Sequence, residues 1–248
     1  MNTPQRHDHE LKARVDALEW YHTMELPGGV VTPGFFDHRP VLHHYAFPAR
    51  LDNIRALDIG TFDGFFAFEM ERRGANVVAL DVPDIDSLDF PAHLARTGRT
   101  RFQPRHQNFD LARSSLGSAV ERRFVSVYDV GDADLGQFDF VFVGSVLIHL
   151  RDPVGALMGL VTVLKPAGTI HICEEVHRAL DWLGRSRPLA KFQAISPHLT
   201  WWIPNRACWE HMLLAAGFVE VEHGATFALP FTGRRGGVRH GVLTAKAP

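Results

Sequence analysis

The sequence has little cysteine and no long uninterrupted apolar run, and both absences exclude classes of protein. Cys173 and Cys208 lie far apart without the spacing of a metal site, so we expect neither a disulfide framework nor a bound metal. Charged residues interrupt every apolar stretch before it reaches the length of a membrane span. The polar residues 1–10 contain no apolar signal-peptide core. We therefore expect a cytoplasmic protein that has no membrane partner.

The chain also lacks a large charge excess of either sign. Its 26 Lys and Arg residues nearly balance 28 Asp and Glu residues, and a formal net charge of −2 gives no general attraction to a polyanion. Two local basic clusters depart from that balance: Arg96, Arg99, Arg101 and Arg105, and then Arg234, Arg235 and Arg239. Each cluster is either a solvated loop surface or a pocket for a phosphate, a carboxylate or RNA.

A hydrophobic content of 46% over 248 residues suits one α/β domain with additions. We expect residues 1–50 to form a cap or lid, and residues 51–248 to form the main domain with irregular insertions at about 83–106 and 176–203. A plain surface loop is the alternative for the first insertion. Within the cap, we expect a helix over about 9–20, an irregular segment over 20–34 and a short helix over 39–47.

From residue 54 onward, short apolar runs alternate with amphipathic segments, as in βαβ folds. Strands are predicted over 56–59, 76–80, 124–128, 138–143, 169–173, 218–222 and 241–245, and helices over 65–73, 109–116, 154–164 and 205–216. Asn205 is placed to cap the last of these helices. This alternation predicts an α/β fold with a doubly wound, mostly parallel seven-stranded sheet, helices on both faces and a closing antiparallel pair.

The stretch from Ala56 to Gly64, with the sequence ALDIGTFDG, has the pattern of a strand that turns tightly into a helix beneath a nucleotide-like ligand. Gly60 permits the turn, Gly64 permits close approach of ligand or helix, and Asp63 is placed to cap that helix. Asp81 lies about twenty residues further on, where an acid can accept hydrogen bonds from both ribose hydroxyls.

Two phosphate-binding motifs are absent. A dinucleotide loop requires Gly-x-Gly-x-x-Gly, but its middle position here is Phe62 and no third glycine follows. No P-loop ending in Gly-Lys-Ser/Thr occurs. Because both motifs are absent, the loop suits a ligand without a diphosphate. Acids also occur at three successive predicted strands: Asp58 within the first, Asp81 after the second and Asp129 after the third.

These motifs, with the segments Phe138–Phe142 and Leu164–Thr169, resemble those of class I S-adenosylmethionine-dependent methyltransferases over residues from about 54 to 176. The resemblance implies a Rossmann-like sheet of the class I type and S-adenosyl-L-methionine as the cofactor. Asp81 would hold the ribose, Asp129 and Val130 would border the adenine, and Gly144 and Ser145 would line the sulfonium side. The full implied set of cofactor contacts is Asp58, Gly60, Thr61, Gly64, Asp81, Val82, Asp129, Val130, Gly144 and Ser145.

Three further segments resemble a narrower subgroup that contains the bacterial tRNA wobble-uridine carboxymethyltransferase and natural-product enzymes. They are WYH at 20–22 with PGG at 27–29, VLIHLRDP at 146–153, and WIPN at 202–205. The approach to the glycine loop lacks the tryptophan- and lysine-rich character associated with a carboxylated cofactor, and Ile148 replaces an aromatic hydroxyl. Ordinary S-adenosylmethionine is therefore expected.

Methyl transfer needs an aligned nucleophile and, for a hydroxyl or an acidic carbon, removal of a proton. His149 follows the fourth strand and His22 lies among aromatics of the cap, so both are candidate catalytic residues. A structural role, in packing or hydrogen bonding to backbone, is the alternative for each. Candidate substrate contacts are Trp20, Tyr21, Glu174, His198, Trp201 and Trp202, with core packing or a solvated strand end as the alternative.

Three functions remain open from the sequence. The preferred one is methyl transfer to an O, N or C atom of a small-molecule acceptor, such as a secondary metabolite. The second is modification of the tRNA wobble uridine, which requires a nucleic-acid partner and which the near-neutral charge disfavours. The third is a cofactor-binding partner protein without catalysis. A homo-oligomer is compatible with all three.

Overall fold

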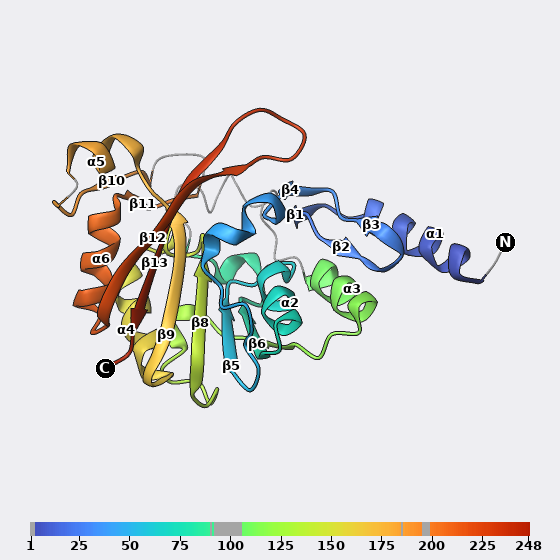
Figure 1. The fold of residues 1–248 in the computed structure, drawn as a ribbon, viewed down its shortest axis with the longest axis horizontal. Coiled ribbons are helices and arrows are strands. Elements are labelled where there is room, and N and C mark those ends of the chain that lie inside the picture. The colour runs from blue at the N-terminus through green and yellow to red at the C-terminus, as the bar shows by residue number, and fades with distance from the viewer. Residues whose placement is uncertain (1–2, 90, 92–105, 185, 195–198) are drawn as a thin grey trace.

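The computed structural model describes residues 3–89, 91, 106–184, 186–194 and 199–248. A seven-stranded sheet with the strand order β12-β13-β9-β8-β5-β6-β7 forms its centre (Figure 1). The strands are β5 (Arg55–Ile59), β6 (Asn76–Asp81), β7 (Glu121–Phe124), β8 (Phe138–Gly144), β9 (Leu164–Glu175), β12 (Val219–Pro230) and β13 (Gly237–Lys246). Strands β5 to β9 pair in parallel, whereas β13 runs antiparallel to both β9 and β12. The predicted sheet and its closing antiparallel pair are confirmed.

Helices cover both faces of this sheet. Helices α2 (Phe65–Arg72) and α3 (His106–Leu116) pack on one face, and α4 (Pro153–Thr162) and α6 (Arg206–Ala215) pack on the other. The remaining helices are α1 (Thr3–Asp16) and α5 (Arg178–Leu183). Because successive residues of a strand point to opposite faces, Ala56 packs into the core beneath α2 and α3, whereas Leu57 packs into the core beneath α4 and α6. Asn205 caps α6 as predicted, with its Oδ1 accepting a hydrogen bond from Cys208 N at 2.9 Å.

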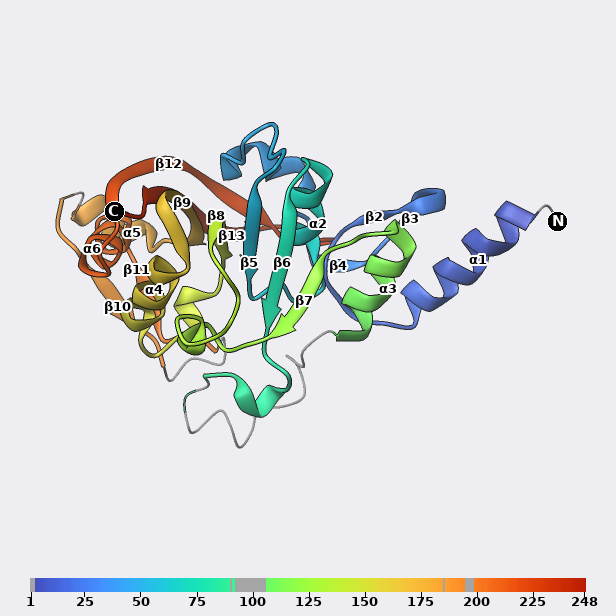
Figure 2. The same cartoon turned by 90° about the horizontal axis from the view of Figure 1, so that it is seen from below.

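The N-terminal segment is more regular than the prediction for 20–34. Strand β1 (Trp20–His22) pairs in parallel with β4 (Gly34–Phe36), and β2 (Glu25–Leu26) pairs with β3 (Val30–Val31). Two 3-10 turns, η1 (Pro27–Gly29) and η2 (Arg39–Tyr45), complete the segment. Helix α1 begins before the predicted residue 9 and ends before residue 20, because Trp20 already belongs to β1. It projects away from the sheet on the side opposite α6 (Figure 2).

The tip of the β12–β13 hairpin reaches this N-terminal segment. Phe231 forms an isolated bridge with Phe36, and Thr232 N donates to the carbonyl of Phe35 at 3.0 Å. The guanidinium of Arg234 lies 4.6 Å and 4.0 Å from the ring centres of Phe35 and Phe231. Arg234, from the second basic cluster, therefore makes a structural contact that links the hairpin to the N-terminal segment. The β12–β13 hairpin, although distant in sequence, therefore contacts the N-terminal segment directly.

The prediction of a strand over 124–128 is wrong. Strand β7 ends at Phe124, and Val127–Asp129 form the 3-10 turn η4, with the Ser126 hydroxyl accepting a hydrogen bond from Tyr128 N. An edge strand has a ladder on one side only, so a local side-chain cap easily ends it. The ranges predicted as insertions hold short elements: η3 (Ile85–Ser87), α5, β10 (Ala190–Phe192) and β11 (Trp202–Pro204). Within the described ranges, no helix has both the length and the apolar character needed to cross a bilayer.

Candidate active site

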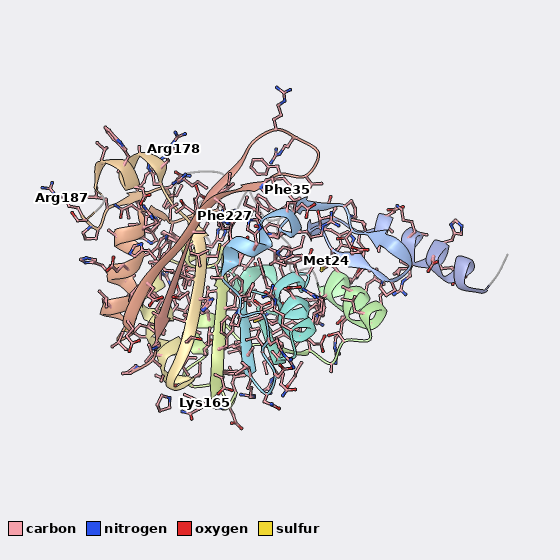
Figure 3. All side chains as sticks on the ribbon, in the orientation of Figure 1. Met24, Phe35, Lys165, Arg178, Arg187 and Phe227 are labelled. Atoms are coloured by element: carbon pink, nitrogen blue, oxygen red, sulfur yellow. The ribbon has the colours of Figure 1, made fainter. Side chains whose placement is uncertain are left out.

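A pocket lies at the carboxyl ends of β5, β6 and β8, where ligands bind in doubly wound sheets. It encloses about 1240 Å³ counted to its open mouth. Loops after these strands form most of its wall, and Tyr21 and His22 of β1 close one side. Lys165, at the start of β9, marks the opposite end of the sheet in Figure 3, while Met24 and Phe35 mark the end that the N-terminal segment covers.

The glycine loop has the tight geometry that its sequence predicts. Gly60 and Phe62 adopt positive φ angles of 68° and 55°. A Cβ atom at Gly60, which lines the pocket, would lie only 2.6 Å from Val146 Cγ2. Gly64 also has a positive φ, but it lies off the pocket wall, and a Cβ there would lie 2.3 Å from the Phe68 ring. Gly64 therefore serves helix packing, the second of its two predicted roles.

Asp81 ends β6 and lines the pocket. Its Oδ1 accepts a hydrogen bond from Val82 N at 2.8 Å, while its buried Oδ2 has no partner among the described residues. Burial raises the pKa of Asp81 to about 6. An unpaired buried carboxylate oxygen is costly unless a ligand supplies donors, and two ribose hydroxyls would do so. Asp81 and its position in the pocket therefore fit the ribose of an adenosyl cofactor.

Asp58 lies within β5 and also lines the pocket. Only 2% of it is exposed, and its Oδ2 has no hydrogen-bond partner in the part of the chain that the structure describes. Burial raises the pKa of Asp58 to about 7. The pocket therefore holds two carboxyl groups, Asp58 and Asp81, each with one oxygen left for a ligand donor.

The residues predicted to border the adenine are displaced. Asp129 is exposed and Val130 is buried in the core, and neither lines the pocket. Because β7 ends four residues earlier than predicted, the wall is built instead by residues 125–128. Tyr128 OH donates to Asp89 Oδ2 at 2.6 Å, and the same oxygen accepts Arg151 N at 2.7 Å. Neither Asp89 nor Tyr128 was predicted, because Tyr128 fell within the misplaced strand and Asp89 within the range predicted as an insertion.

Asp63 does not cap α2, contrary to the prediction. The N-cap position is Gly64, which makes no side-chain capping bond. The fully buried Asp63 instead bonds to β1: its Oδ2 accepts Tyr21 N at 2.8 Å and His22 N at 3.0 Å, and its Oδ1 pairs with His22 Nδ1. The glycine loop thereby holds the N-terminal segment against the pocket.

His149, the other candidate catalytic histidine, lines the pocket from the turn after β8. Its Nδ1 lies 2.8 Å from the carbonyl of Leu199. Because a carbonyl only accepts, Nδ1 carries the hydrogen and Nε2 holds the lone pair. Burial lowers the pKa of His149. The structure therefore brings His22, His149 and Tyr21 to the same pocket.

A residue of the last strand also reaches this site. Ser145 lines the pocket, and its Oγ lies 2.8 Å from His240 Nε2. His240 Nδ1 faces the carbonyl of Val238 at 3.0 Å, so the Ser145 hydroxyl donates to Nε2. Burial lowers the pKa of His240 to about 4. No sequence pattern pointed to His240, which stands 95 positions from Ser145.

Glu174 was expected to follow the fifth strand and face the acceptor, but it lies within β9 and is fully buried. Its Oε1 accepts the amides of Val146 and Leu147 at 2.9 and 3.0 Å. Burial raises the pKa of Glu174 to about 8, against the opposing effect of these amides. Glu174 thus shapes the turn after β8 from behind and does not line the pocket.

The three tryptophans predicted as substrate contacts lie off the pocket wall. Each indole donates to a backbone carbonyl: Trp20 to Val15 at 3.0 Å, Trp201 to Asp89 at 2.7 Å and Trp202 to Arg151 at 3.3 Å. Thr61, a predicted cofactor contact, is also off the wall, and its amide donates to Leu80 O at 2.9 Å. His198 lies outside the described residues, as do Arg96, Arg99, Arg101 and Arg105. Val82 and Gly144 line the pocket as predicted.

Comparison with known proteins identifies the family to which this chain belongs. A family model described as a methyltransferase domain matches residues 40–223. The ubiquinone biosynthesis O-methyltransferase of Alkalilimnicola ehrlichii is 28% identical over 168 residues, covering 66% of this chain and 58% of that protein. The protein of the same name from Xanthomonas campestris pv. campestris is 29% identical over 140 residues, covering 52% and 50%. The chain spans about half the length of these curated relatives.

Among solved structures, the N-terminal domain of EvdMO1, determined in the presence of SAH and D-fucose, has a TM-score of 0.63 at 20% identity. The alignment covers 100% of this chain and 98% of that one, and it shows a shared fold. The narrower resemblance to the tRNA-modifying subgroup stays a prediction. The family model covers well over half of the chain. The chain therefore belongs to the methyltransferase domain family.

Proposed function

We propose that the protein transfers a methyl group from S-adenosylmethionine to an O, N or C atom of a small-molecule acceptor. The observation that carries this proposal is one pocket lined by two kinds of group. It presents the open carboxylate oxygen of Asp81 together with the imidazoles of His22 and His149. The carboxylate suits a ribose, and the imidazoles suit a nucleophile that must be aligned and deprotonated.

The bound cofactor would supply a methyl group activated by the positive sulfur. The protein's own residues have three tasks in this proposal. Asp81 holds the ribose, the backbone of Gly60 lets the cofactor approach the loop, and the covering β1 keeps water out. A small acceptor is favoured over RNA because the net charge of −2 offers no general attraction to a polyanion.

Calorimetry with S-adenosylmethionine tests the binding half of this proposal. We expect one site per chain with a dissociation constant in the micromolar range. The transfer half is tested with cofactor labelled in its methyl group and a panel of small acceptors, whose products are identified by mass spectrometry. No heat of binding at millimolar cofactor would refute the proposal, as would transfer to tRNA alone.

A further inference from the structure

Asp63 belongs to the glycine loop, yet every hydrogen bond described for it goes to β1. The two carboxylate oxygens of Asp63 have different partners. Oδ2 accepts the backbone amides of Tyr21 and His22, at 2.8 and 3.0 Å, and Oδ1 faces the ring nitrogen Nδ1 of His22. A carboxylate only accepts, so Nδ1 of His22 donates and carries the hydrogen. The lone pair of the ring is thereby assigned to Nε2.

Neighbouring rings fix the orientation of His22. The Phe65 ring stacks at 5.7 Å with an interplanar angle of 28°, and the Tyr21 ring meets the imidazole edge-on at 4.9 Å. Within the described part of the chain, no hydrogen bond occupies Nε2, and His22 lines the pocket. A nitrogen with an accessible lone pair on a ring that cannot turn is the arrangement of a general base.

His149 at the pocket and His240, which bonds to Ser145 of the pocket wall, are less suited to hold a proton. The Nδ1 of His149 donates to the neutral carbonyl of Leu199, and burial lowers the pKa of His149. The Nε2 of His240 is already occupied by the Ser145 hydroxyl. Only His22 has a buried carboxylate against its Nδ1, which stabilises the ring once Nε2 is protonated.

We propose that His22 is the general base of the reaction and that Asp63 is its positioning residue, which rests on the proposed methyl transfer. This assignment narrows the acceptor. A neutral amine attacks with its own lone pair and needs no base beforehand, whereas a hydroxyl must lose its proton as it attacks. The structure therefore favours an acceptor that must lose a proton, and a hydroxylated small molecule is the one that we propose.

The step balances in atoms and charge. The hydroxyl oxygen of the acceptor forms a bond to the methyl carbon as the methyl–sulfur bond breaks, and the electron pair of that bond stays on sulfur. The hydroxyl proton passes to His22 Nε2. The positive charge that sulfur loses appears on the imidazole ring, next to the Asp63 carboxylate, and solvent later takes the proton.

The variant Asp63→Asn separates the two tasks of this carboxylate. The amide oxygen in the place of Oδ2 still accepts the two backbone amides, while the amide nitrogen in the place of Oδ1 donates toward the ring. His22 must then present its lone pair at Nδ1 and carry the hydrogen on Nε2. Long-range proton–nitrogen NMR of the His22 ring reads this tautomer without cofactor or acceptor. We expect the Nδ1–H form in the native protein and the Nε2–H form in the variant.

Turnover gives the second measurement. General acid–base catalysis contributes about 100- to 10,000-fold, so we expect Asp63→Asn to lower kcat at least about 100-fold with the cofactor Kd changed less than about twofold. Should that variant fail to fold, His22→Gln keeps a donor toward Asp63 but has no base, and the same loss is expected. Glu210→Gln, which alters an exposed pair with His223 at 2.8 Å, is the matched control and should leave kcat unchanged.

The acceptor class is tested with a panel of hydroxylated compounds, each paired with an amine of the same shape, such as catechol with o-phenylenediamine. Transfer to hydroxyls that falls away in Asp63→Asn supports the assignment. Transfer to amines alone, an unchanged tautomer, or full turnover in both variants would overturn it while leaving methyl transfer intact. Cofactor binding without transfer to any compound would instead refute the proposed function, and with it the base role.

Discussion

In the part of the chain that the structure describes, three buried carboxyl groups at or near the site have raised pKa values and unpaired oxygens. Asp58, Asp81 and Glu174 each have one buried oxygen without a hydrogen-bond partner among the described residues, and burial raises the pKa of all three. Two of them line the pocket, where a ligand can satisfy the free oxygen. Glu174 does not, so its free oxygen bears on the stability of the protein and not on binding.

Replacing Glu174 by Gln should change how stability depends on pH. The pKa of Glu174 is about 8 in the folded protein against an ordinary value of 4.5, so between those pH values the folded state holds one proton more than the unfolded chain. The free energy of unfolding therefore falls as pH rises, by at most about 1.4 kcal/mol per pH unit. Gln mimics the protonated form and removes this slope.

Chemical denaturation at several pH values between 5 and 8 checks this expectation. The variant should gain stability relative to the native protein steadily as pH rises, because only the native protein has a carboxyl group that resists ionisation. Lys165→Met, at the far end of the sheet, serves as a control for removal of a charge. A constant difference between Glu174→Gln and native protein across the range would contradict the raised pKa.

Asp81 and Asp129 offer a matched pair for cofactor binding. Asp81 lines the pocket with a free oxygen, whereas Asp129, predicted from the sequence to lie near the adenine, is exposed and off the wall. Hydrogen bonds to charged groups contribute about 1.5–3 kcal/mol, so Asp81→Asn should weaken the cofactor Kd at least about tenfold. Asp129→Asn should change it less than about twofold. Calorimetry measures both dissociation constants. An equal loss of cofactor affinity in the two variants would support the sequence-based prediction that Asp129 also contacts the cofactor.

At the scale of elements, the cover of the pocket depends on β1. This strand is held from one side by Asp63 of the glycine loop and from the other by β4, whose Gly34 lies against it. The β12–β13 hairpin in turn pairs with the end of β4 through Phe231. Three segments distant in sequence therefore position His22, and small changes in any of them should reach the site.

Gly34→Ala should loosen this cover. A Cβ atom at Gly34 would lie 2.1 Å from the backbone carbon of His22, so β1 and β4 must separate, at a cost of about 1–3 kcal/mol. Hydrogen exchange should show loss of protection at the Tyr21 and His22 amides, and cofactor affinity should fall.

Gly117→Ala is the control for this experiment. Gly117 has a φ of 62° in open space, so its substitution costs a comparable roughly 1–2 kcal/mol of backbone strain. A Cβ atom at Gly117 would meet nothing within 4 Å in the described structure, so the Tyr21 and His22 amides should keep their protection. If both alanine variants left those two amides equally protected, β1 would not depend on its packing against Gly34.

At the scale of the whole molecule, one hydrophobic core lies on each face of the sheet, and the pocket lies at the carboxyl ends of its central strands. Ligand at one hundred times its Kd stabilises a folded protein by about 2.7 kcal/mol. For a chain of this length, we expect SAH to raise Tm by roughly 5–10 °C, at about 2–4 °C per kcal/mol.

Thermal unfolding followed by calorimetry measures this shift. Methionine alone, which lacks the ribose that Asp81 would hold, should raise Tm by less than about 1 °C at the same concentration, and Asp81→Asn should reduce the response to SAH. If methionine raised Tm as much as SAH does, the contact between Asp81 and the ribose would not contribute to the affinity.

The sequence by itself determined the fold and placed Gly60 and Asp81 at the pocket. Apolar strands at regular intervals, Gly60 in a tight turn and Asp81 after the second strand are local patterns, and local backbone preferences suffice to predict them. It could not determine the boundary of β7, where a serine cap competes with an edge ladder, and so misplaced Asp129. Only the tertiary structure decided that Asp63 bonds to His22 and that His240 bonds to Ser145, because the residues of each pair stand 41 and 95 positions apart and only folding brings them together.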